Sequence, residues 1–455
     1  MQQKSDEVLL GYVKGLCENI RRQYTVSPEQ FDLESVKRGL RNADGTGVLA
    51  GVTRIGSVRG YQMVDGAPEP TQGRLFYRGI DVMDIVQAHQ KTGDFGFEEV
   101  AYLLLFGQLP ALVQLERYNA ILSAARKLPE HFTEDMIIKA PSPNIMNKLS
   151  RAVLALYSYD VNPDDISTEN LIRQSIELIG RLPVIVAHAY SVKRHYYDGE
   201  SLFIHVPKEN LSMAENFLHM LRKDNQFTPE EARLLDMMLI IHAEHGGGNN
   251  SAFACRVLSS SGTDTYGAIA GAISSLKGPL HGGANTKVMA MFEDIRANVK
   301  DPADEEEVYR YVCKIRDREA HDRSGKIYGL GHAVYTLSDP RAVLLKRYAM
   351  QMAEEKGFMA EFRLMEAVER QGIRALNEKL GKRKSISANV DMYSGLVYKM
   401  LGIPEELYTP LFAIARIAGW CAHRIEEVLV ADRIIRPAYR AVMENAEYVP
   451  MEARG

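Results

Sequence analysis

Residues 242 to 285 constrain the fold more than any other stretch, because they place three histidines beside glycines at helix boundaries. The stretch begins His-Ala-Glu-His-Gly-Gly-Gly-Asn-Asn and ends Gly-Pro-Leu-His-Gly-Gly-Ala-Asn. Just upstream, Thr228-Pro229-Glu230-Glu231 is a capping box with proline at the first helical position, which predicts the start of a buried helix. Gly246 can end that helix in a left-handed cap, so we expect His242 and His245 on one face of its last turn.

The third histidine, His281, falls between two further predicted helices. The first covers residues 265 to 276 and stops at Gly278-Pro279. The second begins just after His281, because apolar residues recur at helical spacing from Val288 to Ile295. An imidazole ahead of a helix N-terminus feels positive potential, which lowers its pKa. We therefore expect His281 to be neutral and able to donate one hydrogen bond.

Composition limits the class of protein. The chain has 455 residues, 46% of them hydrophobic, so it can bury a large core, and its length predicts two or three domains. Its 55 basic and 59 acidic side chains give a net charge of -4, which excludes a general attraction to nucleic acid or anionic membranes. Four widely spaced cysteines without a CxxC pair indicate free thiols. With a polar start and no apolar run of membrane-spanning length, we expect a cytoplasmic protein.

The pattern along the chain is mainly helical. Residues 6 to 22 have the spacing of an amphipathic helix, followed by a polar segment, and this part is typical of an arm on a partner. Short alternating segments from Val52 to Tyr77, separated by glycines, predict a small antiparallel sheet. Helical spacing dominates from there on, so the fold class is all-α with a small N-terminal antiparallel β segment.

Charged residues outside the histidine stretch indicate an anion site. Asp339 and Pro340 predict a helix start with Arg341 in its first turn, where the guanidinium and free backbone N–H groups point the same way. Arg416 lies on the apolar stripe of the last helix, and no carboxylate is available at the neighbouring helical positions. Burying an unpaired guanidinium costs about several kcal/mol, so Arg416 needs either a distant acid or an anionic ligand.

Ordinary structural roles remain open for most of these residues. His242 and His245 could form half of a metal site, although zinc usually needs a third protein ligand. Asp391 could be only a helix-start carboxylate, and the run Lys382-Arg383-Lys384 could be a solvated loop. His281 could hydrogen-bond its own backbone, although the glycines after it favour close approach of another group.

Six motifs in order resemble the citrate synthase family over roughly residues 50 to 440. They are His-Ala-Glu-His245, Gly-Pro-Leu-His281-Gly-Gly-Ala-Asn, Gly-Leu-Gly-His332 followed by Asp-Pro-Arg341, Asn-Val-Asp391-x-Tyr-Ser-Gly, Phe412-Ala-Ile-Ala-Arg416, and Ile-Arg436-Pro. The resemblance implies a two-domain helical homodimer. Its expected parts are an N-terminal arm of residues 1–47, a large domain of residues 48–283 plus 401–455, and a small domain of residues 284–400.

The resemblance also implies a reaction of the tricarboxylic acid cycle, the condensation of acetyl-CoA with oxaloacetate followed by hydrolysis to citrate and CoA. Asp391 would act as the base, while His281 and His332 would donate hydrogen bonds to the enolate and the keto oxygen. No metal or cofactor is expected. The expected oxaloacetate-binding residues are His245, Arg341, Phe412, Arg416 and, from the other subunit, Arg436.

Some positions depart from the commoner bacterial pattern. Ala333 and Thr336 stand where arginine and lysine are frequent, so we expect Lys382, Arg383 and Lys384 to contact the CoA phosphates instead. A 2-methylcitrate synthase, which takes propionyl-CoA, is the alternative within the class. A non-catalytic metabolite-binding protein on the same scaffold, or a zinc hydrolase built on His242 and His245, are alternatives from other classes.

Overall fold

The computed structural model describes residues 24–42, 46–64, 67–381, 385–430 and 432–454, together with Val13 and Cys17. The chain divides into two compact units, one of residues 1–49 with 436–455 and the other of residues 50–435. The helix predicted for residues 6 to 22 lies almost wholly outside the described residues. The first unit contains the short helix α2 (Pro28–Leu33), which begins with Pro28 after Ser27.

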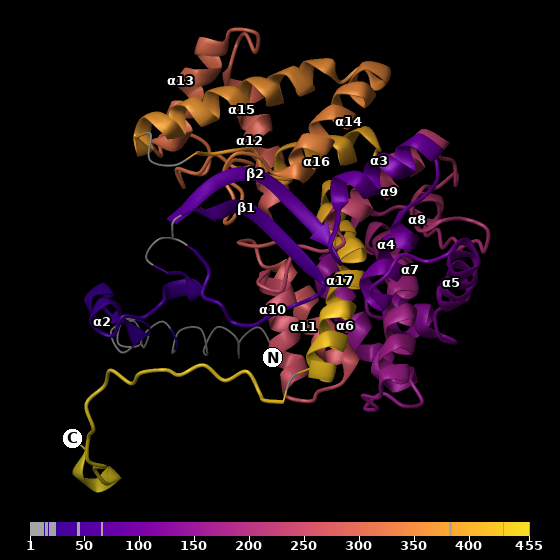
Figure 1. The fold of residues 1–455 in the computed structure, drawn as a ribbon, viewed down its shortest axis with the longest axis horizontal. Helices are drawn as coiled ribbons and strands as arrows, with labels where there is room; N and C mark the ends of the chain where they lie inside the picture. The colour runs from indigo at the N-terminus through magenta and orange to yellow at the C-terminus, as the bar shows by residue number, and fades with distance from the viewer. Residues whose placement is uncertain are drawn as a thin grey trace. The chain divides into compact units, whose positions relative to one another are not determined.

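The second unit is built almost entirely of helices, as the sequence predicts (Figure 1). Its first helices are α3 (Val82–Thr92), α4 (Phe97–Phe106), α5 (Leu112–Ala125), α6 (Ile145–Leu156), α7 (Thr168–Asp198), α8 (Met213–Leu221), α9 (Pro229–His242) and α10 (Asn250–Ser260). They are followed by α11 (Thr265–Lys277), α12 (Ala284–Asn298), α13 (Glu305–Arg316), α14 (Pro340–Lys356), α15 (Met359–Leu380), α16 (Asp391–Met400) and α17 (Tyr408–Val430).

A three-stranded antiparallel sheet precedes these helices, in the region where the sequence predicts strands. Strand β1 (Gly56–Val64) pairs with β2 (Ala67–Tyr77), and β3 (Ile80–Asp81) pairs with the end of β2. The side chain of Asp81 then caps α3 by accepting a hydrogen bond from the N–H of Met83 at 2.9 Å. The sheet therefore leads directly into the helical body.

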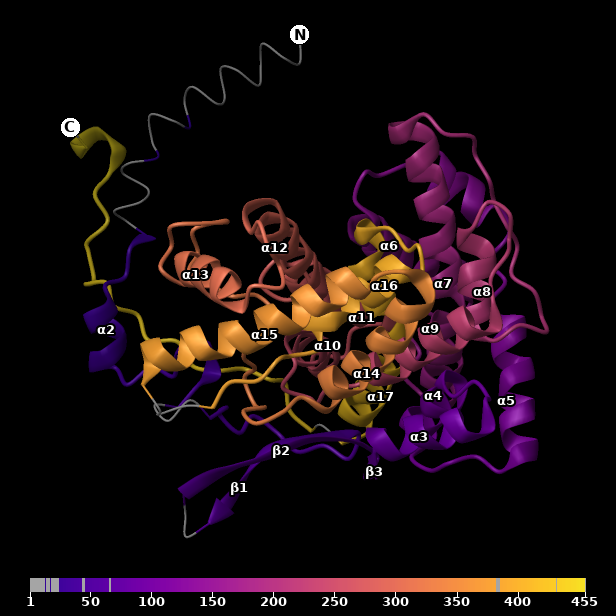
Figure 2. The ribbon, with the colours of Figure 1, turned by 90° about the horizontal axis from the view of Figure 1, so that it is seen from above.

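Helix α17 forms the centre of the helical body and packs against α4, α6, α7, α9, α10 and α11 (Figures 1 and 2). Almost all of its residues from Tyr408 to Glu427 are buried, more than one apolar stripe predicts, and Trp420 is fully enclosed. Arg416 and His423 lie on this helix and are carried into the interior with it. The core therefore contains charged and polar groups that need partners.

Helices α12 to α16 gather into a separate group, drawn in orange in Figure 1. Within it, α16 packs against α12, α14 and α15, and α13 packs against α15. The group corresponds to the part of the chain predicted as a small domain, residues 284–400, and that boundary remains a prediction. No helix within the described ranges is long and apolar enough to cross a membrane.

Most predicted helix ends are confirmed, and two differ. Thr228 caps α9 by accepting from the N–H of Glu231 at 3.2 Å, as the capping box predicts. The helix nevertheless ends at His242, so the prediction that His245 lies in its last turn was wrong. The physical reason is Glu244, whose Oε1 accepts the N–H of Gly246 at 2.5 Å and turns the chain earlier. The pair Thr409-Pro410 also predicts a helix start from the sequence, and α17 begins one residue earlier, at Tyr408.

Two glycines of the hairpin allow it to contact the segment between His332 and Arg341. A Cβ atom on Gly60 would lie 2.4 Å from the carbonyl oxygen of Val334, and one on Gly73 would lie 2.0 Å from that of Ser338. Real Cβ atoms do not approach backbone this closely, so only glycine permits the contact.

We expect Gly73→Ala to lower the free energy of unfolding by about 1–3 kcal/mol, because the added methyl group must displace backbone. Thermal unfolding followed by circular dichroism measures the effect. Gly51→Ala is the control, because nothing lies within 4 Å of a Cβ atom at Gly51. Equal melting temperatures for the two variants would contradict the close approach.

Candidate active site

A cavity of about 140 Å³ lies where the ends of several helices meet. It is bordered by the C-terminal end of α9, the N-terminal ends of α12, α14 and α16, and the first turns of α17. Eight residues singled out in the sequence line it: His242, His245, His281, His332, Arg341, Asp391, Phe412 and Arg416. Helix N-termini carry partial positive charge, so this arrangement favours an anionic ligand.

His281 is fixed by a neighbouring hydroxyl. Its Nε2 lies 3.0 Å from Oγ of Ser251 at the start of α10, and its backbone N–H donates to Gly278 at 2.9 Å. Burial lowers the pKa of His281 to about 4, and the charge of Arg416 adds to this shift. Burial therefore favours the neutral imidazole that the sequence predicts, and it is the main cause of the lowered pKa.

His332 is held in one tautomer by backbone groups. Its Nδ1 accepts the N–H of Val334 at 3.0 Å and the N–H of Tyr335 at 3.1 Å. A nitrogen that accepts carries no proton, so in the neutral ring the proton sits on Nε2. The ring stacks on Tyr335 with centroids 4.6 Å apart, and its centroid is 5.1 Å from that of His245. His332 can thus donate a hydrogen bond from Nε2.

The loop that carries His332 is tied to the segment that carries Asp391. Gly331 N–H donates to Ser387 at 2.8 Å, Asn389 N–H donates to Gly329 at 2.9 Å, and the Asn389 side chain donates to the carbonyl of Gly331 at 2.9 Å. Gly329 and Gly331 have φ of +86° and +85°, a conformation that favours glycine. These bonds place residues far apart in sequence on one wall of the cavity.

Asp391 is the first residue of α16, and its backbone N–H donates to Oδ1 of Asn389 at 3.0 Å. Burial raises the pKa of its carboxyl group to about 6, while Arg341 opposes this shift and Asp339 adds to it. A carboxylate with a raised pKa is a stronger base than an exposed one. Asp391 is therefore suited to accept a proton near neutral pH.

Arg416 is buried, with 1% of its surface exposed, and it lacks an ion-pair partner among the described residues. Its Nε donates to the carbonyl of His242 at 2.5 Å, and its guanidinium lies over the ring of Phe412 at 4.6 Å. Nη1 and Nη2 have no hydrogen-bond partner in the described part of the chain. Burial lowers the pKa of Arg416 to about 10, which leaves it charged. An anionic ligand would satisfy both nitrogens.

Arg341 lies in the first turn of α14, as predicted, and its guanidinium forms an ion pair within the chain. Its Nε and Nη2 donate to the carboxylate of Asp339 at 3.0 and 2.7 Å, and the same carboxylate caps α14 by accepting the N–H of Arg341. The sequence predicted Asp339 as a cap but not as an ion-pair partner. Arg341 thus lines the cavity with its charge already largely balanced.

His242 and His245 have different environments. Nδ1 of His242 lies 2.7 Å from the carbonyl of Met238 and therefore donates to it, which leaves Nε2 as the acceptor. Nε2 of His245 has no partner within the described residues. Burial lowers the pKa of both rings, to about 3 for His242. No group of three or more possible metal ligands was found in the described ranges.

Four predicted site residues are not placed at the cavity. Lys382, Arg383 and Lys384 lie outside the described residues, and Arg436 is an exposed residue of the other compact unit. The structure adds lining residues that sequence reasoning missed, among them Asn249, Asn285, Tyr398 and Tyr408. Ser251, which contacts His281, was missed as well. Its closeness in sequence to the Gly-Gly-Gly-Asn-Asn run after His245 was the only signal for it.

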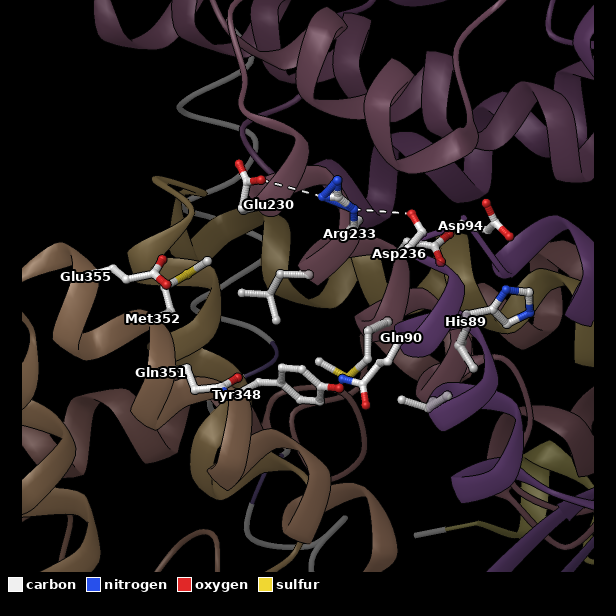
Figure 3. A pocket seen from close by; sticks show the side chains of 15 residues that line it. His89, Gln90, Asp94, Glu230, Arg233, Asp236, Tyr348, Gln351, Met352 and Glu355 are labelled. Carbon is white, nitrogen blue, oxygen red and sulfur yellow. Dashed lines mark hydrogen bonds and ion pairs between the residues drawn. The ribbon is translucent and has the colours of Figure 1, made fainter.

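A larger cavity, of about 270 Å³, lies elsewhere, between α3, α9 and α14 (Figure 3). None of the predicted site residues lines it. Its deepest acid, Asp236, accepts the backbone N–H groups of Gly96 and Phe97 at 2.7 and 3.2 Å. Arg233 pairs with Glu230 at 3.5 Å. These groups have partners already, so the candidate chemistry lies at the smaller cavity.

Comparisons with known proteins agree with the arrangement of the smaller cavity. The family described as citrate synthase, C-terminal domain, matches residues 43–438. The citrate synthase of Synechocystis sp. is 35% identical over 427 residues, which cover 93% of this chain and 95% of that protein. 2-methylcitrate synthase 1 of Corynebacterium glutamicum is 33% identical, covering 92% and 98% of the two chains.

A solved structure gives the same result for the fold. Citrate synthase from Thermoplasma acidophilum, in a ternary complex with carboxymethyl coenzyme A and oxaloacetate, matches with a TM-score of 0.75 at 28% identity, covering 92% of this chain and 99% of that one. A family match over most of the sequence and a shared all-α fold lead to one conclusion: this chain belongs to the citrate synthase family.

Proposed function

We propose that this acyltransferase condenses acetyl-CoA with oxaloacetate and then hydrolyses the thioester to citrate and CoA. The observation that carries the proposal is one cavity that combines Asp391, His281 and His332 with the guanidinium of Arg416. The relatives named above are citrate and 2-methylcitrate synthases, which supports the same reaction class.

In the first step Asp391 takes a proton from the acetyl methyl group. The negative charge moves to the thioester oxygen, where His281 donates a hydrogen bond to the enolate. The contact between Nε2 of His281 and Oγ of Ser251, at 3.0 Å, supports this role because it fixes the position of the ring beside the cavity. Asp391 then holds the proton that it removed.

In the second step the enolate carbon attacks the keto carbon of oxaloacetate. Nε2–H of His332 donates a hydrogen bond to the keto oxygen, where the negative charge gathers as the new carbon–carbon bond forms. One proton, equal in number to the one that Asp391 removed, then converts this alkoxide to the hydroxyl. Water then adds to the thioester carbonyl, and CoA leaves as the thiol. Neutral imidazoles suit these roles because they can donate hydrogen bonds without the cost of burying two charges.

Arg416, Arg341 and His245 would hold the dicarboxylate, with Phe412 beside them. Each charge-assisted hydrogen bond contributes on the order of 1.5–3 kcal/mol. We also propose that the chain forms a homodimer in which Arg436 reaches the site of the second copy.

Residues 284–400 would form a small domain that closes over the large domain of residues 48–283 and 401–455. We further propose that the enzyme acts in the cytoplasm and needs no metal or cofactor.

The choice of acyl group is the second question, because a 2-methylcitrate synthase is among the relatives at 33% identity. One methylene changes specificity by only about 1–3 kcal/mol. We expect thiol release with oxaloacetate and acetyl-CoA. The ratio of the kcat/KM values for acetyl-CoA and propionyl-CoA decides between a citrate synthase and a 2-methylcitrate synthase. Absence of thiol release with both would contradict the proposed function.

Asp391→Asn should lower kcat by about 10²- to 10⁴-fold, because the amide cannot accept the methyl proton. The same thiol-release assay measures the loss, and circular dichroism checks the fold. Asp135→Asn is the control, since Asp135 pairs with Lys139 at the surface and does not line the cavity. A rate near that of the unmodified chain would refute Asp391 as the base.

The raised pKa of Asp391, to about 6, predicts the pH dependence. Below that pH the carboxyl group is protonated and cannot act as a base, so kcat/KM should fall by about tenfold per pH unit on the acid side. His281, with its pKa lowered to about 4, is already neutral there and adds no limb near pH 6. A pH profile that stays flat down to pH 5 would contradict this assignment.

Replacing Lys382, Arg383 and Lys384 together with alanine should raise the apparent KM for acetyl-CoA and leave that for oxaloacetate unchanged, because phosphate contacts act on CoA alone. Steady-state kinetics with each substrate varied in turn measures this. An unchanged KM for acetyl-CoA would remove these residues from the site.

A further inference from the structure

Arg416, Gly419 and His423 lie on one face of α17, and Glu244 lies over the middle of that face. A Cβ atom on Gly419 would be 2.5 Å from Oε2 of Glu244, so only glycine leaves room for this carboxylate. Nε2 of His423 lies 2.8 Å from Oε1 of Glu244. Glu244 and His423 are completely buried, and Arg416 is nearly so. The carboxylate of Glu244 therefore lies over Gly419, with Arg416 about one turn of α17 before that glycine and His423 about one turn after it.

Glu244 bonds to the imidazole and not to the guanidinium. Its Oε1 accepts from His423 and from the N–H of Gly246, at 2.8 and 2.5 Å, while its Oε2 has no hydrogen-bond partner among the described residues. Nη1 and Nη2 of Arg416 lack partners in the same part of the chain. Opposite charges attract strongly where water is excluded. Something must therefore keep Oε2 of Glu244 from pairing with the guanidinium of Arg416.

His423 supplies that restraint because its proton is directed at Glu244. Its Nδ1 lies 2.7 Å from Nη2 of Arg256, which can only donate, so Nδ1 accepts and the proton sits on Nε2. Arg256 is fixed in turn by Glu427 at 2.7 Å and by Glu426. The contact of Arg256 with Nδ1 thus makes Nε2 of His423 a permanent donor to Glu244.

We propose that His423 and Glu244 are positioning residues that keep Arg416 available for a ligand carboxylate. Glu244 balances the buried guanidinium from a distance, and its hydrogen bonds to His423 and Gly246 stop it from forming a direct ion pair that would occupy Nη1 and Nη2. This inference rests on the proposed function, in which Arg416 binds oxaloacetate. It assigns a role to two residues that do not line the cavity.

The first test compares His423→Leu with His423→Gln in the full chain. Leucine has no donor, so Glu244 is released toward Arg416, and oxaloacetate affinity measured by calorimetry should fall by about tenfold or more. Glutamine can donate to Glu244 and accept from Arg256, so its affinity should stay within about threefold of the unmodified chain. The KM for acetyl-CoA at saturating oxaloacetate should be similar in both variants.

The second test adds Glu244→Gln to His423→Leu. A neutral amide cannot form an ion pair with Arg416, so the double variant should recover most of the oxaloacetate affinity lost in His423→Leu. A merely structural role predicts the opposite, a further loss. Should His423→Leu not fold, Arg256→Met tests the same point, because loss of the donor to Nδ1 lets the imidazole proton move away from Glu244.

Glu427→Gln is the matched control, because Glu427 is also buried, while Arg256 keeps its ion pair with Glu426 and its contact with His423 when Glu427 is made neutral. It should lower the melting temperature without changing oxaloacetate affinity. Equal losses of affinity in Glu427→Gln and His423→Leu, or no recovery in the double variant, would overturn the inference and leave the proposed function standing. An unmodified chain that neither binds oxaloacetate nor releases thiol would contradict the proposed function and this inference with it.

Discussion

A buried guanidinium without a direct counter-ion is the constraint on which the rest of the structure depends. Arg416 lies in the central helix, where water cannot solvate it, and its two terminal nitrogens have no partner within the described residues. Leaving a charge in this state costs about several kcal/mol. The fold tolerates it because α17 is packed on all sides and because a carboxylate, an aromatic ring and a carbonyl group surround it.

Around this charge the chain assembles groups whose protonation is set by burial. Burial keeps the imidazole of His281 neutral, and backbone N–H groups hold that of His332 in one tautomer. A single carboxylate, that of Asp391, is made more basic by the same low dielectric. Exclusion of water therefore has two effects at once: it keeps His281 neutral and it raises the pKa of Asp391.

Sequence reasoning succeeded where a local signal determines the structure. The capping boxes, the proline and glycine positions and the apolar spacing predicted the helices that flank His281 and those that carry Arg341 and Asp391, and the glycine-separated alternation predicted the sheet. It failed where a side chain replaces a backbone interaction. Glu244 ends α9 early through Gly246, and Asp339 binds the guanidinium of Arg341 in addition to capping α14. Only the family resemblance predicted that the site residues lie together. Contacts between distant residues, such as that of Ser251 with His281, produce no repeating pattern in the sequence.

The ion pair between Asp339 and Arg341 has a consequence for charge balance. Because that aspartate already neutralises one guanidinium, Arg416 is the only cation among the described cavity residues without a direct ion pair. A molecule with two carboxylates would arrive with a surplus negative charge, in a place where Asp391 is also ionisable. Tight capture of such a dianion therefore requires positive charge contributed from beyond these helices, and the pocket by itself discriminates better against neutral molecules than between monoanions and dianions.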